Sequence, residues 1–235
     1  MANPPTVVLI HGLFGFRRLL WIEYFQGIRQ LYEEMGMRVI VVSLPWAGSI
    51  RQRTNVLAEQ LESESGSLHL VAHSMGGLDA RCWISCMDGA SKVASLTTLA
   101  TPHRGSAAAD LISQTYSPFR LFVGARDLTI AKLKHFNQTA LNHPDVIYRS
   151  FAASRPVEEQ PWLVRHFGRT IQMTEGDNDS QVSVSSAIWG EHVATLPCDH
   201  FELIFKNLWL NPFRTRTRYN PMPIYRAIGE WILQH

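Results

Sequence analysis

The stretch Leu70-Val71-Ala72-His73-Ser74-Met75-Gly76-Gly77 decides the fold, because a short apolar run leads through a serine directly into a segment with helical spacing. A serine at such a sharp strand-to-helix turn takes a strained backbone conformation, and bulky side chains two residues before or after it would collide. Ala72 and Gly76 occupy those two positions. The stretch therefore predicts a nucleophilic hydroxyl at Ser74. The alternative is a serine that only caps the following helix.

Apolar runs alternate with helix-like segments through the first hundred residues. We expect strands at 6–10, 38–44, 68–72 and 93–100, and helices at 21–35, 54–64 and 75–87. Strands and helices in alternation imply right-handed crossovers between parallel strands. The expected fold class is therefore α/β, with a mostly parallel central sheet that carries helices on both faces.

The alternation breaks between residues 101 and 167, where five prolines and aromatic residues without a clear period indicate irregular structure. We expect one domain over 1–235, with a small cap inserted at 104–165. After it, strands are expected at 170–174 and 192–196, and helices at 201–208 and 225–233.

Composition excludes several classes of protein. The 235 residues suit one domain, and a net charge of +2 gives no basic surface for nucleic acid. Three cysteines are too few for a disulfide framework and lack zinc-ligand spacing. No stretch approaches the roughly 18 apolar residues of an integral membrane segment. The N-terminal residues lack the pattern of a signal peptide, which predicts a cytoplasmic protein unless a leader has been removed.

A nucleophilic serine in acyl chemistry needs N–H donors for the negative charge that develops on the substrate oxygen. The backbone N–H of Met75, just after the serine, is one candidate. The loop after the first strand offers another at Leu13, where neighbouring glycines allow close approach. His11 precedes the nucleophile and is interpreted as a residue that shapes this loop. Phe14 and Phe16 beside it are candidates for the substrate pocket.

The serine also needs a base, and the base needs a carboxylate that orients it. His200, just past the last expected strand, is the candidate base. Asp177 and Asp179 are both candidates for the carboxylate. Asp199 adjoins His200, and side chains of neighbouring residues rarely point together, so it is a poor candidate.

Five segments together resemble the bacterial triacylglycerol lipases of the α/β-hydrolase superfamily: VVLIHGLFGF (7–16), VAHSMGGLDAR (71–81), LTTLATPHRGS (96–106), EGDNDSQVSVSSAIWG (175–190) and CDHFELI (198–204). The resemblance implies an α/β-hydrolase fold with Ser74 as nucleophile and His200 as general base. The Asn-Asp pair at 178–179 matches the motif of the catalytic acid, so the resemblance favours Asp179. Leu13 and Met75 match the oxyanion positions.

The chain also departs from this family. Larger lipases have glycine after the catalytic aspartate, where this chain has Ser180. They also hold a structural calcium through a carboxylate two residues after the catalytic histidine. Glu202 occupies that place and is a calcium candidate, although no further ligands can be identified. The chemistry itself requires no cofactor.

The expected substrate is a small-molecule ester or a lipid. Aromatic residues of the expected cap either line an acyl pocket or form the core of the cap: Tyr116, Phe119, Phe122, Phe136, Phe151 and Trp162. The basic run 214–218 is a solvated loop or, alternatively, makes transient contact with an anionic lipid surface. Asp79 and Arg81 are expected to form a local polar pair or a helix cap. An acyltransferase with the same triad and a non-catalytic lipid-binding protein remain the alternative functions.

Overall fold

A six-stranded sheet forms the centre of the computed structural model, which describes residues 4–15, 18–19, 22–115, 123–204 and 219–235. The strand order is β4-β1-β5-β6-β7-β8, and every neighbouring pair is parallel. The strands are β1 (Thr6–Ile10), β4 (Arg38–Val41), β5 (Leu68–His73), β6 (Val93–Leu99), β7 (Ile147–Ala153) and β8 (Glu191–Leu196). A separate antiparallel pair joins β2 (Arg18–Leu19) to β3 (Ile22–Glu23). The predicted parallel α/β sheet is confirmed.

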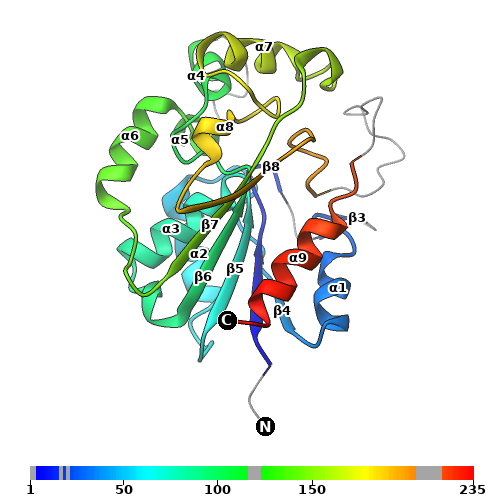
Figure 1. Ribbon diagram of the computed structural model, residues 1–235. Helices are drawn as coiled ribbons and strands as arrows, with labels where there is room; N and C mark the ends of the chain where they lie inside the picture. Colours follow the sequence, from blue (N-terminus) through cyan, green and yellow to red (C-terminus); the bar gives the residue numbers. More distant parts are fainter. Residues whose placement is uncertain (1–3, 16–17, 20–21, 116–122, 205–218) are drawn as a thin grey trace.

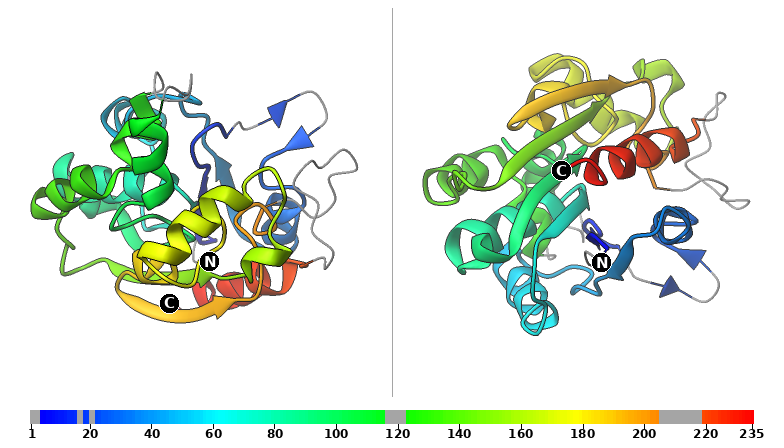
Figure 2. Two further views of the ribbon diagram at one scale, coloured as in Figure 1. Left: turned by 90° about the horizontal axis from the view of Figure 1, so that it is seen from above. Right: turned by 60° about the horizontal axis from the view of Figure 1, so that its bottom comes forward.

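Helices cover both faces of the sheet, as the apolar runs predict. In β1, Val7 and Leu9 pack into one cluster of buried side chains, whereas Val8 and Ile10 pack into another. The first cluster includes residues of α1 (Ile28–Glu34) and α9 (Met222–Ile232), and the second includes residues of α2 (Ile50–Gln60) and α3 (Gly76–Cys86). Figures 1 and 2 show α1 and α9 together on one side of the sheet, opposite α2 and α3. Strands buried on both faces read as continuous apolar runs, which is why they were predictable.

Further helices gather at the carboxyl ends of the strands, in the upper part of Figure 1. They are α4 (Ala107–Gln114), α5 (Val123–Asp127), α6 (Ile130–Thr139), α7 (Arg165–Thr174) and α8 (Val184–Ala187). Short 3-10 helices lie at Gly89–Lys92 and Val157–Glu159. None of the helices among the described residues combines the length and apolar character needed to cross a membrane.

The stretch 104–165, predicted as one cap insertion, contains β7, which lies inside the central sheet between β6 and β8. Polar residues interrupt the apolar run of β7, so the sequence pattern did not predict this strand. The Arg149 guanidinium pairs with Glu191 at 3.2 Å and lies over the Trp231 ring, while Ser150 Oγ donates to the Glu191 carbonyl. Phe151 consequently belongs to the main core and not to a cap.

The strand predicted at 170–174 is wrong, because these residues form the C-terminal half of α7. Their β-branched side chains favour a strand, but Phe167 and Ile171 are spaced by one helical turn. Both pack against Ala107 and Ala108 of α4, so tertiary contact overrides local preference.

The helix predicted at 201–208 is a turn over 201–204, and its remainder lies outside the described residues. The same holds for Phe16, for Tyr116, Phe119 and Phe122, and for the basic run 214–218.

Candidate active site

Ser74 lies between β5 and α3 with a φ of 56°, a left-handed conformation that L-residues rarely adopt. Its backbone N–H donates to the Leu99 carbonyl at 2.9 Å, and its carbonyl accepts from Thr101 Oγ1 at 2.7 Å. A Cβ at Gly76 would lie 2.6 Å from the Ile10 carbonyl oxygen. The turn is therefore held by hydrogen bonds to the Ser74 backbone, and the close approach of the Ile10 carbonyl requires the small residue predicted at position 76.

Three side chains distant in sequence meet at this turn. Ser74 Oγ lies 2.9 Å from His200 Nε2, and His200 Nδ1 lies 2.8 Å from Asp179 Oδ2. Ser74 is 9% exposed, His200 5% and Asp179 0%. A carboxylate only accepts, so Nδ1 of His200 carries the proton and Nε2 is the acceptor for the serine hydroxyl. This geometry would allow His200 to take the Ser74 proton while Asp179 orients the ring.

Asp179 is oriented by its own loop. Its Oδ1 accepts from the backbone N–H groups of Gln181 and Val182, at 2.9 and 2.7 Å, which leaves Oδ2 for His200. Its carbonyl accepts from the His200 N–H at 3.0 Å, so the two residues are joined twice. Hydrogen bonds at both carboxylate oxygens fix the direction in which this acid faces.

The other acid candidates face elsewhere. Asp177 is exposed and makes no hydrogen bond to His200. Asp199 Oδ1 accepts from the N–H groups of Phe201 and Glu202, and burial, followed by the nearby Glu202 carboxylate, raises its pKa to about 8. Of the three aspartates, only Asp179 is hydrogen-bonded to the His200 imidazole.

The loop after β1 lies directly against Ser74, since a Cβ at Gly12 would come within 2.7 Å of the Ser74 Cβ. Among the described residues, neither the Leu13 nor the Met75 backbone N–H donates to a protein acceptor. Met75 is nevertheless buried, and Leu13 packs against the same cluster of side chains. Buried N–H groups are rarely left without a partner, so these two are suited to receive an oxygen from a bound molecule.

His11 holds this loop in the way the sequence interpretation anticipated. Its Nε2 accepts from the Leu44 N–H at 3.0 Å, and its Nδ1–H donates to the Gly12 carbonyl at 2.9 Å. Burial, together with the nearby Arg53 charge, lowers the pKa of His11 to about 4. The ring is therefore neutral at neutral pH and has a fixed tautomer.

Arg53 is a supporting residue that sequence reasoning missed. Its buried guanidinium pairs with Asp79 at 2.8 Å and also donates to the His11 carbonyl at 2.6 Å and the Pro45 carbonyl at 2.9 Å. The local pair predicted between Asp79 and Arg81 is wrong, because Asp79 reaches across to α2 instead. Arg81 donates to Asn137 and to the Ala140 carbonyl. No spacing in the sequence signals these long-range contacts.

Phe14, the pocket candidate, is 38% exposed and its ring centroid lies 5.6 Å from that of Trp46. Its N–H donates to the Trp46 carbonyl, and its φ is 56°. The pair forms an exposed aromatic edge beside the Leu13 loop. A role for Phe14 in substrate binding stays a prediction.

Glu202, the calcium candidate, is engaged with a cation already present in the chain. Its Oε2 lies 2.6 Å from Arg155 Nη2 and also accepts from the Asp199 N–H. Among the residues that the structure describes, no group of three or more His, Cys, Asp or Glu side chains is arranged to hold a metal ion. A calcium ion at Glu202 stays a prediction.

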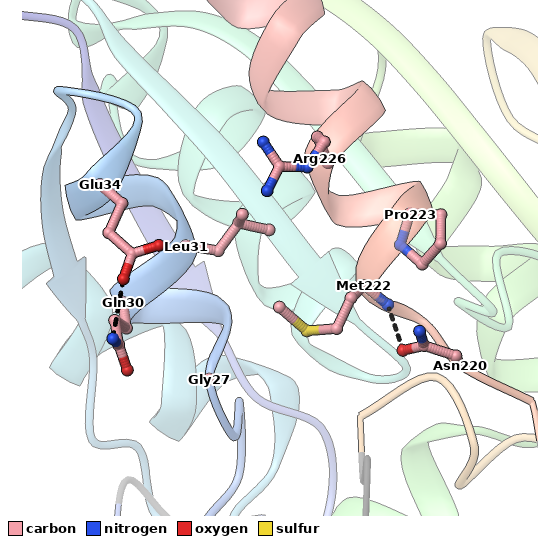
Figure 3. Close-up of a pocket in the computed structure, with 8 residues that line it drawn as sticks. All are labelled: Gly27, Gln30, Leu31, Glu34, Asn220, Met222, Pro223 and Arg226. Atoms are coloured by element: carbon pink, nitrogen blue, oxygen red, sulfur yellow. Dashed lines mark hydrogen bonds between the residues drawn. The ribbon is translucent and has the colours of Figure 1, made fainter.

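A cavity of about 450 Å³ lies elsewhere, between α1 and α9 (Figure 3). It is lined by Gly27, Gln30, Leu31, Glu34, Asn220, Met222, Pro223 and Arg226. None of these residues contributes to the Ser74 site.

The sequence of this chain matches a known protein family. The model of the alpha/beta hydrolase family matches residues 7–228. Triacylglycerol lipase 2 of Saccharomyces cerevisiae is 34% identical, over 86% of this chain and 70% of its own length. A triacylglycerol lipase of Vibrio cholerae is 37% identical over 45% of this chain, but only 35% of that longer protein is covered.

Solved structures support the fold. The mature lipase of Bacillus licheniformis superposes with a TM-score of 0.77 at 21% identity, covering 97% of this chain and 93% of that one. A metagenomic carboxyl esterase gives 0.82, also at 21% identity, covering 100% of this chain and 77% of that one. With the family model matched over nearly its whole length, the chain belongs to the alpha/beta hydrolase family, and it is similar to the family's triacylglycerol lipases.

Proposed function

We propose that this chain hydrolyses carboxylic esters through an acyl-enzyme formed on Ser74. The class of enzyme, a carboxylic ester hydrolase of the lipase and esterase kind, rests on the family and on relatives that are named triacylglycerol lipases. The observation that carries the mechanism is the continuous hydrogen-bonded line from Ser74 Oγ through His200 to Asp179.

In the acylation step, Ser74 Oγ attacks the ester carbonyl carbon while His200 Nε2 takes the hydroxyl proton. Asp179 holds the imidazole tautomer and stabilises the imidazolium that forms. The Leu13 and Met75 N–H groups donate to the oxyanion, and losing one such donor typically raises the barrier by about 3–4 kcal/mol. Collapse of the tetrahedral intermediate breaks the ester C–O bond, and His200 gives its proton to the departing alcohol.

Deacylation repeats these roles with water as the nucleophile. His200 removes a proton from the water as the water oxygen attacks the acyl carbonyl carbon. The bond between that carbon and Ser74 Oγ then breaks, and His200 returns the proton to Ser74 Oγ. The acid product leaves and the free enzyme is restored. Neither half of the proposed reaction requires a cofactor.

An acyltransferase would share every step up to the acyl-enzyme and differ only in the acceptor. Product analysis with an added alcohol separates the two, because a transferase forms the new ester in preference to the free acid. A non-catalytic lipid-binding protein would release no alcohol from an ester at all. The cytoplasmic location and the contact of residues 214–218 with lipid stay predictions.

The test measures hydrolysis of p-nitrophenyl esters of increasing chain length, with emulsified triglyceride alongside. We expect the wild-type protein to hydrolyse these esters, and we expect a fluorophosphonate to label Ser74. Ser74→Ala should abolish both while unfolding at an unchanged temperature. Ser91→Ala removes an exposed serine whose hydroxyl donates to the Asp88 carbonyl, and it should behave as wild type. Turnover that persists in Ser74→Ala would refute the assignment of the nucleophile.

A further inference from the structure

The Tyr24 hydroxyl, which the mechanism above does not use, lies buried between two parts of the site. It accepts from the Gly12 N–H at 3.1 Å and lies 2.8 Å from Nδ1 of His73, the residue before the nucleophile. The Tyr24 ring centroid lies 5.6 Å from that of His11 and 5.8 Å from that of His73. Tyr24 thus bridges the loop that carries Leu13 and the turn that carries Ser74.

The direction of each hydrogen bond follows from the partners. His73 Nε2 lies 3.1 Å from the His200 carbonyl oxygen, which only accepts, so Nε2 carries a proton. Burial and the nearby His200 hold the pKa of His73 well below its usual value, so the ring is neutral and Nδ1 has no proton. Burial also raises the pKa of Tyr24, which keeps its hydroxyl proton. Tyr24 therefore donates to His73 Nδ1.

The far end of this line holds the backbone of the candidate base. The His200 carbonyl accepts from His73, and the His200 N–H donates to the Asp179 carbonyl at 3.0 Å. The two imidazole centroids are only 4.6 Å apart. His200 is thus held on both sides of its own Cα, by the residue beside the nucleophile and by the acid.

We propose that Tyr24 and His73 are positioning residues for ester hydrolysis. They act through a line of three hydrogen bonds: Gly12 N–H donates to the Tyr24 hydroxyl, Tyr24 donates to His73, and His73 donates to the His200 carbonyl. The inference rests on the proposed function and deepens it. The line joins the oxyanion loop to the base, so that both keep a fixed relation to Ser74. Neither residue touches the reacting atoms in this account.

Removing the Tyr24 hydroxyl breaks the line at its centre. Tyr24→Phe keeps the ring packing but leaves the Gly12 N–H without this acceptor and His73 Nδ1 without its donor. Displacement of catalytic groups by about 1 Å lowers rates by about 10²-fold. We expect kcat for p-nitrophenyl butyrate to fall about ten- to a hundredfold, with KM changed by less than about twofold.

Tyr32→Phe is the matched control. Tyr32 is fully buried in α1, and its hydroxyl has no hydrogen-bond partner among the described residues. It packs against Tyr225 on the face of the sheet away from α2 and α3. Tyr32→Phe should keep the kcat of wild type.

Two substitutions at His73 separate positioning from packing. His73→Gln retains an amide N–H that can donate to the His200 carbonyl, whereas His73→Leu retains bulk without a donor. Gln should recover most of the kcat that Leu loses, with both variants checked by thermal unfolding. Adding Tyr24→Phe to His73→Leu should lower kcat little further, because residues on one line are not additive. If His73→Leu does not fold, Tyr24→Phe and His73→Gln still test the positioning role of Tyr24 and His73.

The outcomes are distinct. Wild type that neither turns over esters nor reacts with a fluorophosphonate refutes the proposed function itself. Active wild type, with Tyr24→Phe indistinguishable from Tyr32→Phe, refutes only the positioning line. Equal losses of kcat in folded His73→Gln and His73→Leu refute the role of the donor to His200.

Discussion

Ser74 and its two partners are held in place by different kinds of contact. The nucleophile half of the site (residues 72–77) connects β5 directly to α3, and backbone contacts with β1 and β6 fix it. The acid–base half (residues 177–183 and 198–202) lies on loops after α7 and after β8. There, hydrogen bonds between side chains and the backbone replace regular structure, as at Asn178, Asp179 and Asp199.

This difference determines which kind of substitution damages each half of the site. In the nucleophile half, atoms are too close for any addition, so adding a methyl group is harmful. In the acid–base half, buried polar groups depend on named partners, so deleting a side chain is harmful because it leaves those partners unsatisfied. The comparison predicts opposite sensitivities, which substitutions can measure.

The largest effect is expected in the acid–base half, from Asp179→Asn. The amide no longer fixes the His200 tautomer or stabilises the imidazolium, and the corresponding change in serine proteases lowers kcat about 10⁴-fold. Asp177→Asn is the control, since Asp177 is exposed. Steady-state kinetics on a soluble ester measure both. A larger loss in Asp177→Asn would overturn the identity of the acid.

The steric limit of the nucleophile half is tested by Gly76→Ala. The new methyl would lie 2.6 and 2.8 Å from the Ile10 and His11 carbonyl oxygens, so the turn must move off β1. We expect about 1–3 kcal/mol of lost stability and a kcat lowered by about 10²-fold. Gly229→Ala is the control, because the three atoms nearest to its methyl belong to the flexible ends of Met35 and Met37. Urea denaturation and kinetics report the two effects; wild-type values for Gly76→Ala would remove the steric argument.

The same contrast explains what sequence reasoning could reach. The turn at Ser74 follows from local sterics, and β1, β4, β5 and β6 follow from apolar runs buried on both faces. Asp177 and Asp179 are the same residue type two positions apart, and only the tertiary contact with His200 separates them. The family resemblance favoured Asp179, but spacing alone left the choice open.

The missed elements share a cause. In β7 the run is broken by Arg149 and Ser150, whose partners come from β8 and α9, so the strand pattern is visible only after folding. Tyr24 and Arg53 support the site through contacts with His73 and Asp79, which lie 49 and 26 residues away. Such pairings have no local signature.

Asn178→Ala measures how far the acid–base half depends on one side chain. Asn178 Oδ1 accepts from Ser180 N and Gln160 Nε2, and Nδ2 donates to the Gly168 and Gly176 carbonyls. Groups left unsatisfied destabilise by about 1–3 kcal/mol. We expect a loss of that order in urea denaturation, and a modest fall in kcat as Asp179 shifts. Asn142→Ala, which breaks one exposed bond to Trp189, should change neither; equal losses in both would contradict the comparison.

The smallest effect concerns pH. Asp199 is fully buried, its Oδ2 has no hydrogen-bond partner among the described residues, and burial raises its pKa from 3.8 to about 8. Between these values the folded chain holds a proton that the unfolded chain releases, so this group lowers stability progressively as pH rises from about 4 to about 8.

Asp199→Asn keeps the acceptor for the Phe201 and Glu202 N–H groups and removes the titration. Its free energy of unfolding should therefore fall less steeply from pH 5 to pH 8 than that of wild type. Asp145→Asn, at an exposed carboxylate, should leave the slope unchanged. Parallel pH profiles for Asp199→Asn and wild type would mean that Asp199 is already ionised in the folded protein, and that its loop tolerates a buried charge.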